Sequence, residues 1–280
     1  MRFRYYFCER EKPELIDFLK QNQIKYKISG NGSARKANII FNIYSDGTYA
    51  EWYIEQFKQI KVFPLVYTEY SEEDRLNAKL LWLWPKSQKI DIINENEAYD
   101  FLCEYRSAFG HSCHKHEVQK GLIAIAKEPA TLSKNCFWTI STGFSELFVS
   151  RRVYEAVQNS PLKGVQFLNV ILKNGDTSDN LFQMVSPNII TRDCIEIGHG
   201  EIIERCCVCG AEQYSINSGE YQLHLDISKL KMESDFYMTE RIFGAGITEP
   251  LYVISQSFYR LLKENGLTGG AQISPVYVSC

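Results

Sequence analysis

Apolar residues follow two similar patterns in the second half of the chain. Short apolar runs, Leu147–Val149 and Tyr252–Ile254, are each followed by a serine and then by apolar residues at three-to-four spacing. That spacing gathers apolar side chains on one face of a helix, and a serine just before a helix can accept a hydrogen bond from an amide of its first turn. A Leu-x-Gly triplet and a further apolar run, 165–172 or 271–278, complete each pattern. The pattern therefore predicts a strand, a helix and a strand, twice.

The two patterns align with each other without a gap from the serine to the glycine, Ser150–Gly164 against Ser255–Gly269. An aromatic pair and an alternating run typical of a strand precede each of them. Both helices carry an apolar stripe that needs a sheet to cover it. We therefore predict an internal repeat within residues 91–280, with halves of about 99–172 and 193–278.

The first ninety residues have a different pattern, in which strand-like runs alternate with two amphipathic segments. The predicted order is strand (2–7), helix (13–21), strand (24–28), strand (38–44), helix (49–59) and strand (62–67). This order predicts a small two-layer α+β domain at residues 1–90, and a ferredoxin-like arrangement is one fold with this order. The predicted fold class is therefore α+β, with this domain followed by the tandem-repeat region.

Composition sets the class of protein and its environment. A chain of 280 residues with 45% hydrophobic and 23% charged residues is long enough for two modest domains with real cores. The net charge of -3 provides no broad attraction to phosphate or anionic lipid, which disfavours nucleic acid and membrane as partners. The segment Met1–Cys8 lacks an apolar run of signal-peptide length, and the apolar cluster Leu80–Trp84 stops at Pro85. We expect a cytoplasmic protein.

Two pairs of soft metal ligands stand out among the polar residues. Cys206 and Cys209 form a Cys-x-x-Cys-Gly motif, and Cys113 and His116 have a Cys-x-x-His spacing about a hundred residues earlier. Because a tight turn lets both members of such a pair reach one ion, the four residues predict a structural Zn²⁺ site with tetrahedral coordination. Neighbours in the same clusters are alternative ligands: His111, His114 and Cys207. The competing interpretation is that both clusters are ordinary core or surface side chains.

The remaining cysteines stand alone in the sequence. An odd total of nine, without a secretory signal, indicates reduced thiols rather than disulfides. A small buried hydrophobe or a surface thiol is the expected role of each of these: Cys8, Cys103, Cys136, Cys194 and Cys280.

Known catalytic arrangements are incomplete in this sequence. A zinc deaminase needs His-x-Glu, but Lys115 stands at the histidine position before Glu117, and Arg205 replaces the proline before the cysteine pair. A His-Glu-x-x-His metalloprotease motif fails because Lys120 occupies the second histidine position. The sequence also contains no Gly-x-x-x-x-Gly-Lys-Ser/Thr phosphate loop. We therefore predict that the metal is structural and that the protein is not an enzyme.

Several short segments carry a resemblance to a known family. These segments are Cys206–Gly210, Ser234–Phe236, Leu251–Ser255 and Gly266–Gly269. The chain resembles the double-CxxCG-motif proteins, a family similar to the immunity proteins that neutralise polymorphic bacterial toxins. The resemblance covers roughly the last two thirds of the chain. It implies a cytoplasmic antitoxin that binds its cognate toxin, and it implies no catalysis.

The chain departs from the family pattern in the first motif. Where the family has Cys-x-x-Cys-Gly, this chain has Cys113, then His116 and then Glu117.

Three functions are compatible with the sequence. We favour a binding protein of the immunity type, and the alternatives are an enzyme with an unfamiliar site and a zinc-ribbon module that binds nucleic acid. The third would require a clustered basic surface, and Arg151, Arg152 and Lys163 are too few to form one.

Overall fold

The computed structural model describes most of the chain. Residues 11, 30–37, 63–64, 86, 89, 107–111, 141–145, 197–201, 206–211, 215–222, 244–248 and 280 lie outside the described residues. The backbone alone is described for residues 65–67, 87–88, 101–106, 112–118, 202–205 and 212–213. The chain forms two compact units, one of Met1–Ser71 and one that begins at Glu72.

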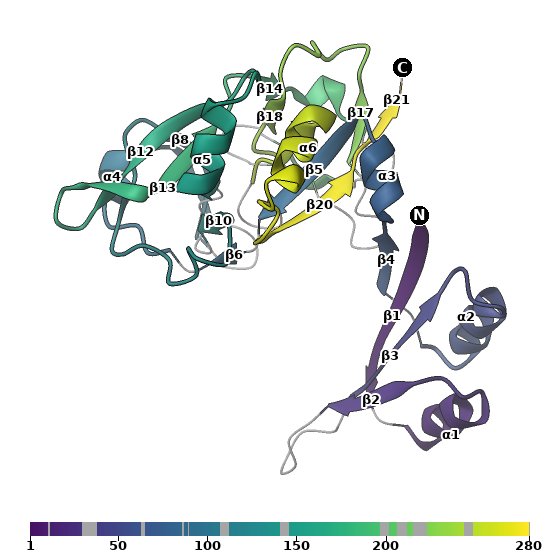
Figure 1. Cartoon of the computed structure of the whole chain (residues 1–280). Helices are drawn as coiled ribbons and strands as arrows, with labels where there is room; N and C mark the ends of the chain where they lie inside the picture. Colours follow the sequence, from purple (N-terminus) through teal and green to yellow (C-terminus); the bar gives the residue numbers. More distant parts are fainter. Residues whose placement is uncertain are drawn as a thin grey trace. The chain divides into compact units, whose positions relative to one another are not determined.

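The first unit is an antiparallel sheet with two helices on one face (Figure 1). Its elements are β1 (Arg2–Arg10), α1 (Pro13–Gln21), β2 (Tyr26–Ser29), β3 (Asn38–Tyr44), α2 (Ala50–Gln59) and β4 (Leu65–Glu69). The sheet order is β2-β3-β1-β4, and all neighbouring strands are antiparallel. This is the connectivity of the ferredoxin-like arrangement.

Alternation along the central strands builds the core of this unit. Ile39, Phe41 and Ile43 are buried on one face of β3, as a period of two requires for a sheet covered on that face. The Phe7 and Phe41 rings stack at a centroid distance of 4.5 Å, and Phe57 of α2 closes over both. The apolar stripes of the two helices therefore lie against this face of the sheet.

The second unit begins earlier than the sequence pattern suggested, at Glu72 rather than near residue 90. It opens with α3 (Glu72–Asn77) and β5 (Leu80–Pro85), and β5 is an inner strand of a five-stranded sheet. Leu80, Leu81, Trp82 and Leu83 are all buried, so both faces of β5 are covered. A strand that is apolar on both faces belongs in the interior of a large unit, and a sheet with helices on one face cannot accommodate it.

The elements of the second unit follow in two series. The first continues with β6 (Ser87–Gln88), α4 (Glu95–Ala98), β7 (Tyr99–Arg106), β8 (Ser112–Gln119), β9 (Ala124–Ile125), β10 (Phe137–Ile140), β11 (Phe148–Ser150), α5 (Arg151–Gln158) and β12 (Gln166–Leu172). The second comprises β13 (Thr177–Val185), β14 (Ile189–Ile190), η1 (Arg192–Cys194), β15 (Ile202–Arg205), β16 (Glu212–Tyr214), β17 (His224–Asp226), β18 (Phe236–Thr239), β19 (Tyr252–Ser255), α6 (Gln256–Glu264), β20 (Ala271–Pro275) and β21 (Tyr277–Ser279).

The two main sheets contain the same series of pairings. One has the order β6-β10-β11-β13-β12-β9, and the other has the order β14-β18-β19-β5-β20. In each, a short strand runs parallel to the first strand of an antiparallel pair, β6 beside β10 and β14 beside β18. In each, a strand lies antiparallel between the two strands that flank the helix, β13 in one sheet and β5 in the other.

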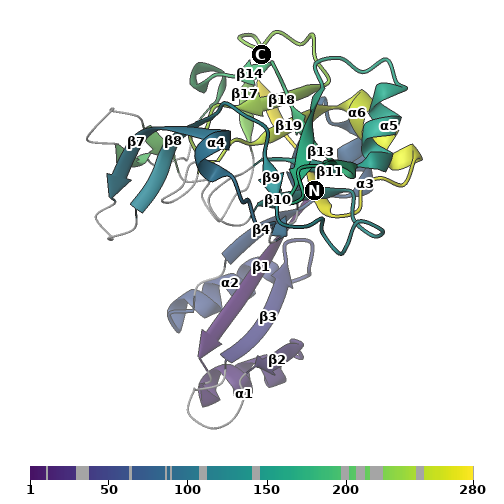
Figure 2. The same ribbon diagram turned by 90° about the vertical axis from the view of Figure 1, so that its left-hand side faces the viewer.

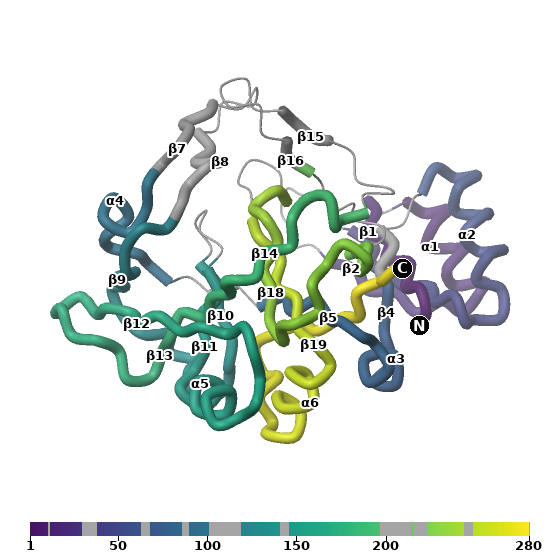
Figure 3. The backbone as a smooth tube through the Cα atoms, turned by 90° about the horizontal axis from the view of Figure 1, so that it is seen from above, coloured from purple at the N-terminus to yellow at the C-terminus, as the bar shows by residue number. Residues whose placement is uncertain are grey.

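The strands that fill these middle positions are exchanged between the two series. β5 starts the first series but lies in the sheet of the second, and β13 starts the second series but lies in the sheet of the first. Figure 3 shows β5 beside β19 and β13 beside β12. The predicted strand-helix-strand segments are present, but their two strands are not neighbours because an exchanged strand separates them.

The helices α5 and α6 cover one core that both sheets share (Figure 1). Val153 and Val157 of α5 and Phe258 and Leu262 of α6 belong to this core, as the apolar stripes predicted. Each sheet also contributes strands to it, for instance through Phe137 of β10. The β7–β8 hairpin extends on the side away from the two helices (Figure 2).

The predicted helix caps differ between the two series. Ser255 caps α6, because its hydroxyl accepts from the amide of Phe258. Ser150 occupies the same position before α5, but its hydroxyl makes no cap hydrogen bond.

The predicted gap-free alignment of the two series also needs a correction. The counterpart of Gly164, which has a positive φ, is Gly270, one residue later than the sequence alignment placed it.

Candidate metal centre

The first predicted ligand pair lies within a strand. Cys113 and His116 both belong to β8, where Cys113 pairs with Tyr105 and His116 pairs with Cys103 of β7. The register of this hairpin shifts at Cys103, so the ladder is irregular beside the His116 position. The tight turn that we expected to hold the pair is therefore absent from this part of the chain, because pairing with β7 keeps the segment extended. His114 pairs with Glu104 in the same strand.

The second predicted pair falls at the end of another hairpin. β15 and β16 are antiparallel, and Arg205 at the end of β15 pairs with Glu212 at the start of β16. Cys206 and Cys209 lie in the connection 206–211, outside the described residues, as does the alternative ligand Cys207. A short connection between two paired strands is where a Cys-x-x-Cys pair can converge on one ion, so the fold is compatible with the predicted motif. His111 also lies outside the described residues.

Similar backbone contacts enclose the two hairpins. An isolated antiparallel bridge joins Ile92 to Ile125 on either side of the first hairpin, and another joins Ile195 to Leu225 on either side of the second. The next residue in each case donates its amide to a carbonyl of the following strand. The nitrogen of Ile93 lies 2.9 Å from the oxygen of Ala124, and that of Glu196 lies 3.0 Å from the oxygen of His224. The two candidate ligand pairs are thus carried by hairpins with equivalent attachments.

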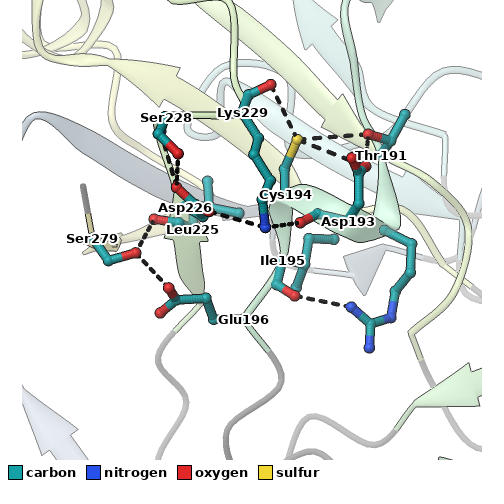
Figure 4. A network of polar contacts seen from close by, with 11 residues as sticks. Thr191, Asp193, Cys194, Ile195, Glu196, Leu225, Asp226, Ser228, Lys229 and Ser279 are labelled. Atoms are coloured by element: carbon teal, nitrogen blue, oxygen red, sulfur yellow. Dashed lines mark hydrogen bonds and ion pairs between the residues drawn. The ribbon is translucent and has the colours of Figure 1, made fainter.

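Polar contacts fix the base of the second hairpin (Figure 4). The Lys229 ammonium lies 3.0 Å from a carboxylate oxygen of Asp226 and donates to the carbonyl oxygen of Asp193 at 3.2 Å. The Lys229 carbonyl accepts from the Cys194 thiol at a distance of 3.6 Å. The Ser279 hydroxyl donates to Glu196, which ties the C-terminal strand to the same base. Strand ends from three places in the sequence are thereby joined.

Hydrogen bonds set the charge states in this network. The hydroxyl of Ser228 and the ammonium of Lys229 lower the pKa of Asp226, and the hydrogen bond from Thr191 lowers the pKa of Asp193. The Asp226 carboxylate in turn raises the pKa of Lys229. All three groups therefore stay charged near neutral pH and are held by structural contacts. These hydrogen bonds and ion pairs hold the strand ends in place.

The Asn94 side chain joins the two ends of the first hairpin. The Asn94 amide nitrogen donates to the carbonyl of Leu122 at 2.9 Å, and its oxygen accepts from the amide of Ala124 at 2.7 Å. An ion pair between Lys120 and Asp100, at 2.6 Å, crosses the hairpin just above this point. Of the residues at the two bases, only Lys120 and Cys194 were considered from the sequence, and neither was considered for this role. Their only local signal is a polar residue beside a short apolar run.

The lone cysteines behave as expected where the structure describes them. Cys136 and Cys194 are buried free thiols, and Cys8 is an exposed one. Burial raises the pKa of Cys136, which keeps the thiol protonated and unreactive. Cys103 lies on β7, and Cys280 falls outside the described residues.

The structure does not test the predicted zinc ligands, because their side chains are not among those described. Among the side chains that are described, no group of three or more His, Cys, Asp and Glu residues is arranged to hold a metal ion.

No helix in the described ranges is long and apolar enough to cross a membrane. No protein-family model matches the chain, and no curated protein matches it either.

Proposed function

We propose that this chain is a non-catalytic binding protein of the immunity type, which neutralises a cognate bacterial toxin in the cytoplasm by direct binding. The segments that resemble the double-CxxCG-motif proteins, Cys206–Gly210 first among them, carry this proposal. Similar bridges enclose the two hairpins that carry the predicted ligand pairs. This supports the proposal, because a motif that occurs twice is expected on two equivalent structural elements.

We further propose that the second unit consists of two copies of one structural repeat, at about 80–172 and 177–279. Matching strand pairings support it, and so do two reciprocal backbone hydrogen bonds. The amide of Cys136, before β10, donates to the carbonyl of Gly269 in the other copy at 2.7 Å. The amide of Asp235, before β18, donates to the carbonyl of Lys163 at 2.9 Å. Reciprocal contacts of this kind are expected for two copies related by an approximate twofold axis.

A structural zinc ion is the second part of the proposal. Cys113, His116, Cys206 and Cys209 would hold it, with His111, His114 and Cys207 as alternatives. Four protein ligands fill a tetrahedral sphere and leave no position for water or substrate. The ion would cross-link the ends of two hairpins, and its binding energy would count as folding energy for that region.

The zinc proposal is tested by metal analysis of the purified full-length chain. We expect about one zinc per chain in protein prepared without added metal, and a loss of that zinc in Cys209→Ser. Cys8→Ser is the matched control, because Cys8 is an exposed free thiol in the other unit. The control should keep its zinc and its stability. A wild-type sample that is metal-free and fully stable would refute the site.

The described residues also bear on the two alternatives. Of the residues considered as a basic surface, Arg151 is held by Glu155 at 2.8 Å, which reduces the charge available for phosphate. The carboxylates with lowered pKa values at the second hairpin base are fixed by structural contacts. Neither observation favours a nucleic-acid module or an enzyme over a binding protein.

Titration of a toxin distinguishes binding from catalysis. The chain is co-expressed with the toxin encoded beside it in its own genome, and we expect growth to be restored. With purified components, inhibition should reach its end point at about one chain per toxin, because each bound molecule neutralises one partner. Protection at far lower ratios would indicate an enzyme that modifies the toxin, and absence of both rescue and binding would overturn the proposal.

A further inference from the structure

A groove lies between the helices α5 and α6 of the second unit, which stand side by side (Figure 1). Its volume is about 540 Å³, within the range of roughly 300–1,000 Å³ that is typical of ligand sites. All of the residues that line it are described, side chains included. Nothing in the sequence analysis or in the proposed function assigns a role to this groove.

One stripe of α5 supplies most of the polar lining. Arg152, Ala156 and Asn159 follow each other at spacings of four and three residues, so they share one face of the helix. Leu261 of α6 and Leu267, which follows α6, line the groove from the other side. The groove therefore combines an apolar surface with a guanidinium near one end of α5 and an amide near the other end.

Arg152 provides the uncompensated charge of this lining. Glu155 also lines the groove, but its carboxylate accepts from the guanidinium of Arg151 at 2.8 Å, and these two charges offset each other. Within the part of the chain that the structure describes, the Arg152 guanidinium forms neither a hydrogen bond nor an ion pair. Its planar set of donors matches a carboxylate, which it can hold with two parallel hydrogen bonds.

Two asparagines add groups that suit a peptide backbone. The Asn265 amide nitrogen donates to the carbonyl of Leu261 at 2.8 Å, which orients this side chain and leaves its oxygen as an acceptor. An asparagine side chain both donates and accepts, as a peptide backbone does. Arg152 and Asn159 are seven residues apart, or about 10 Å along the helix axis. About three residues of an extended peptide cover the same length.

From this arrangement we propose that the groove binds the C-terminal end of a peptide. Arg152 binds the terminal carboxylate, the last side chain is apolar and packs on Leu261 and Leu267, and Asn159 bonds the backbone about three residues earlier. A small carboxylic acid shares the first two contacts, and only a peptide makes the third. This site depends neither on toxin binding nor on zinc.

Titration with short ligands tests the site on the full-length chain. The probe is acetyl-Gly-Gly-Leu with a free carboxylate, added to ¹⁵N-labelled protein. We expect shifts in the side-chain amide signals of Asn159 and Asn265, which single Asn→Ala variants assign. The same peptide with a C-terminal amide should bind at least about tenfold more weakly, because it lacks the charge that Arg152 recognises. The acid 4-methylpentanoate should also bind more weakly, because it has no peptide backbone. Equal affinity of either comparison ligand, or no shift with the free peptide, would overturn the proposal.

Variants separate contact from general attraction. Arg152→Gln should weaken binding of the free peptide at least about tenfold. Arg260→Gln is the matched control, because it removes the same charge from an exposed position of α6 that does not line the groove. Asn159→Ala should weaken binding of the peptide and leave that of 4-methylpentanoate unchanged. Unchanged melting temperatures show that the variants are folded. Equal losses in Arg152→Gln and Arg260→Gln would refute a direct contact with the carboxylate.

Discussion

Gly164 shows how a single residue connects the two series of the second unit. Its φ is +73°, and a Cβ atom added there would lie 1.8 Å from the Ser234 hydroxyl oxygen of the other series. Ser234 cannot easily move away, because its hydroxyl donates to the carbonyl of Phe236 at 2.7 Å. Gly270 lies in the same way against Asn135, with a φ of +85°. Each contact requires a residue without a side chain.

We expect Gly164→Ala to destabilise the protein by about 3 kcal/mol, through backbone strain and overpacking together. Gly175→Ala is the matched control. Gly175 has a φ of +88°, but nothing lies within 4 Å of its added Cβ. It should therefore cost about 1–2 kcal/mol, from backbone strain alone. Urea unfolding of both variants measures the difference, and equal losses would show that the contact with Ser234 has no energetic role.

Tyr259 predicts how stability depends on pH in alkaline solution. Burial, followed by its hydrogen bond to Glu72 at 3.0 Å, raises the pKa of this phenol from 10.0 to about 12. A folded-state pKa above the unfolded value gives stability that is fully present below pH 10 and is lost as the pH rises toward about 12. The folded state must either retain the proton or give up the contact.

Tyr259→Phe should consequently show a shallower loss of stability between pH 10 and about 12 than the wild type. At neutral pH the variant should be less stable by about 1 kcal/mol, because Glu72 loses a hydrogen-bond donor. The other buried tyrosines are present in both proteins, so the difference between their stability curves reports Tyr259 alone. Parallel curves across this range would contradict the assignment.

At the scale of elements, the two helix starts show why equivalent serines behave differently. The Ser255 hydroxyl donates to Asp235 at 2.6 Å, which orients its lone pairs toward the amide of Phe258. The equivalent of Asp235 in the first series is Cys136, since the amides of Ser150 and Ser255 donate to the carbonyls of Cys136 and Asp235 respectively. A buried thiol gives the Ser150 hydroxyl no comparable acceptor, and no cap forms.

Ser255→Ala should therefore cost about 1 kcal/mol of stability, the usual effect of removing an N-cap. Ser150→Ala should cost less, because no cap hydrogen bond is lost there. Chemical denaturation of the two variants under the same conditions measures the difference. A greater loss in Ser150→Ala would mean that its hydroxyl stabilises the fold by a contact other than capping.

At the scale of the whole molecule, the exchanged strands make the two series of the second unit depend on each other. The sheet that contains β11 and β12 is incomplete without β13, and the sheet that contains β19 and β20 is incomplete without β5. The chain passes from the first series to the second once, through an exposed turn at 173–176 between β12 and β13. Strand exchange, more than this turn, therefore holds the two series together.

Division of the chain at this turn tests the dependence. Residues 72–174 and 175–280, expressed separately, should each fail to unfold cooperatively, because each lacks the middle strand of its own sheet. Expressed together, they should assemble into a stable complex with one copy of each. Cooperative unfolding of either fragment alone would show that the exchanged strand is dispensable. Circular dichroism and gel filtration provide both measurements.

Local patterns in the sequence determined much of the secondary structure. Three-to-four spacing predicted α5 and α6, and alternation predicted β3 and the ferredoxin-like order of the first unit. These features depend on which face of one element is apolar, and neighbours in the sequence carry that information. The spacing of Cys113 with His116 and of Cys206 with Cys209 likewise predicts a metal site, and that prediction still awaits its test.

Only the tertiary structure decided how the strands are shared and where the units divide. The run at Leu80–Leu83 reads as a buried strand, but nothing in it specifies that it lies between β19 and β20, about 170 residues later. Pairing between distant strands depends on which edge is left unfilled once the local units have formed. For the same reason the sequence did not show that β8 would hold Cys113 and His116 in an extended strand, because pairing with β7 imposes that conformation.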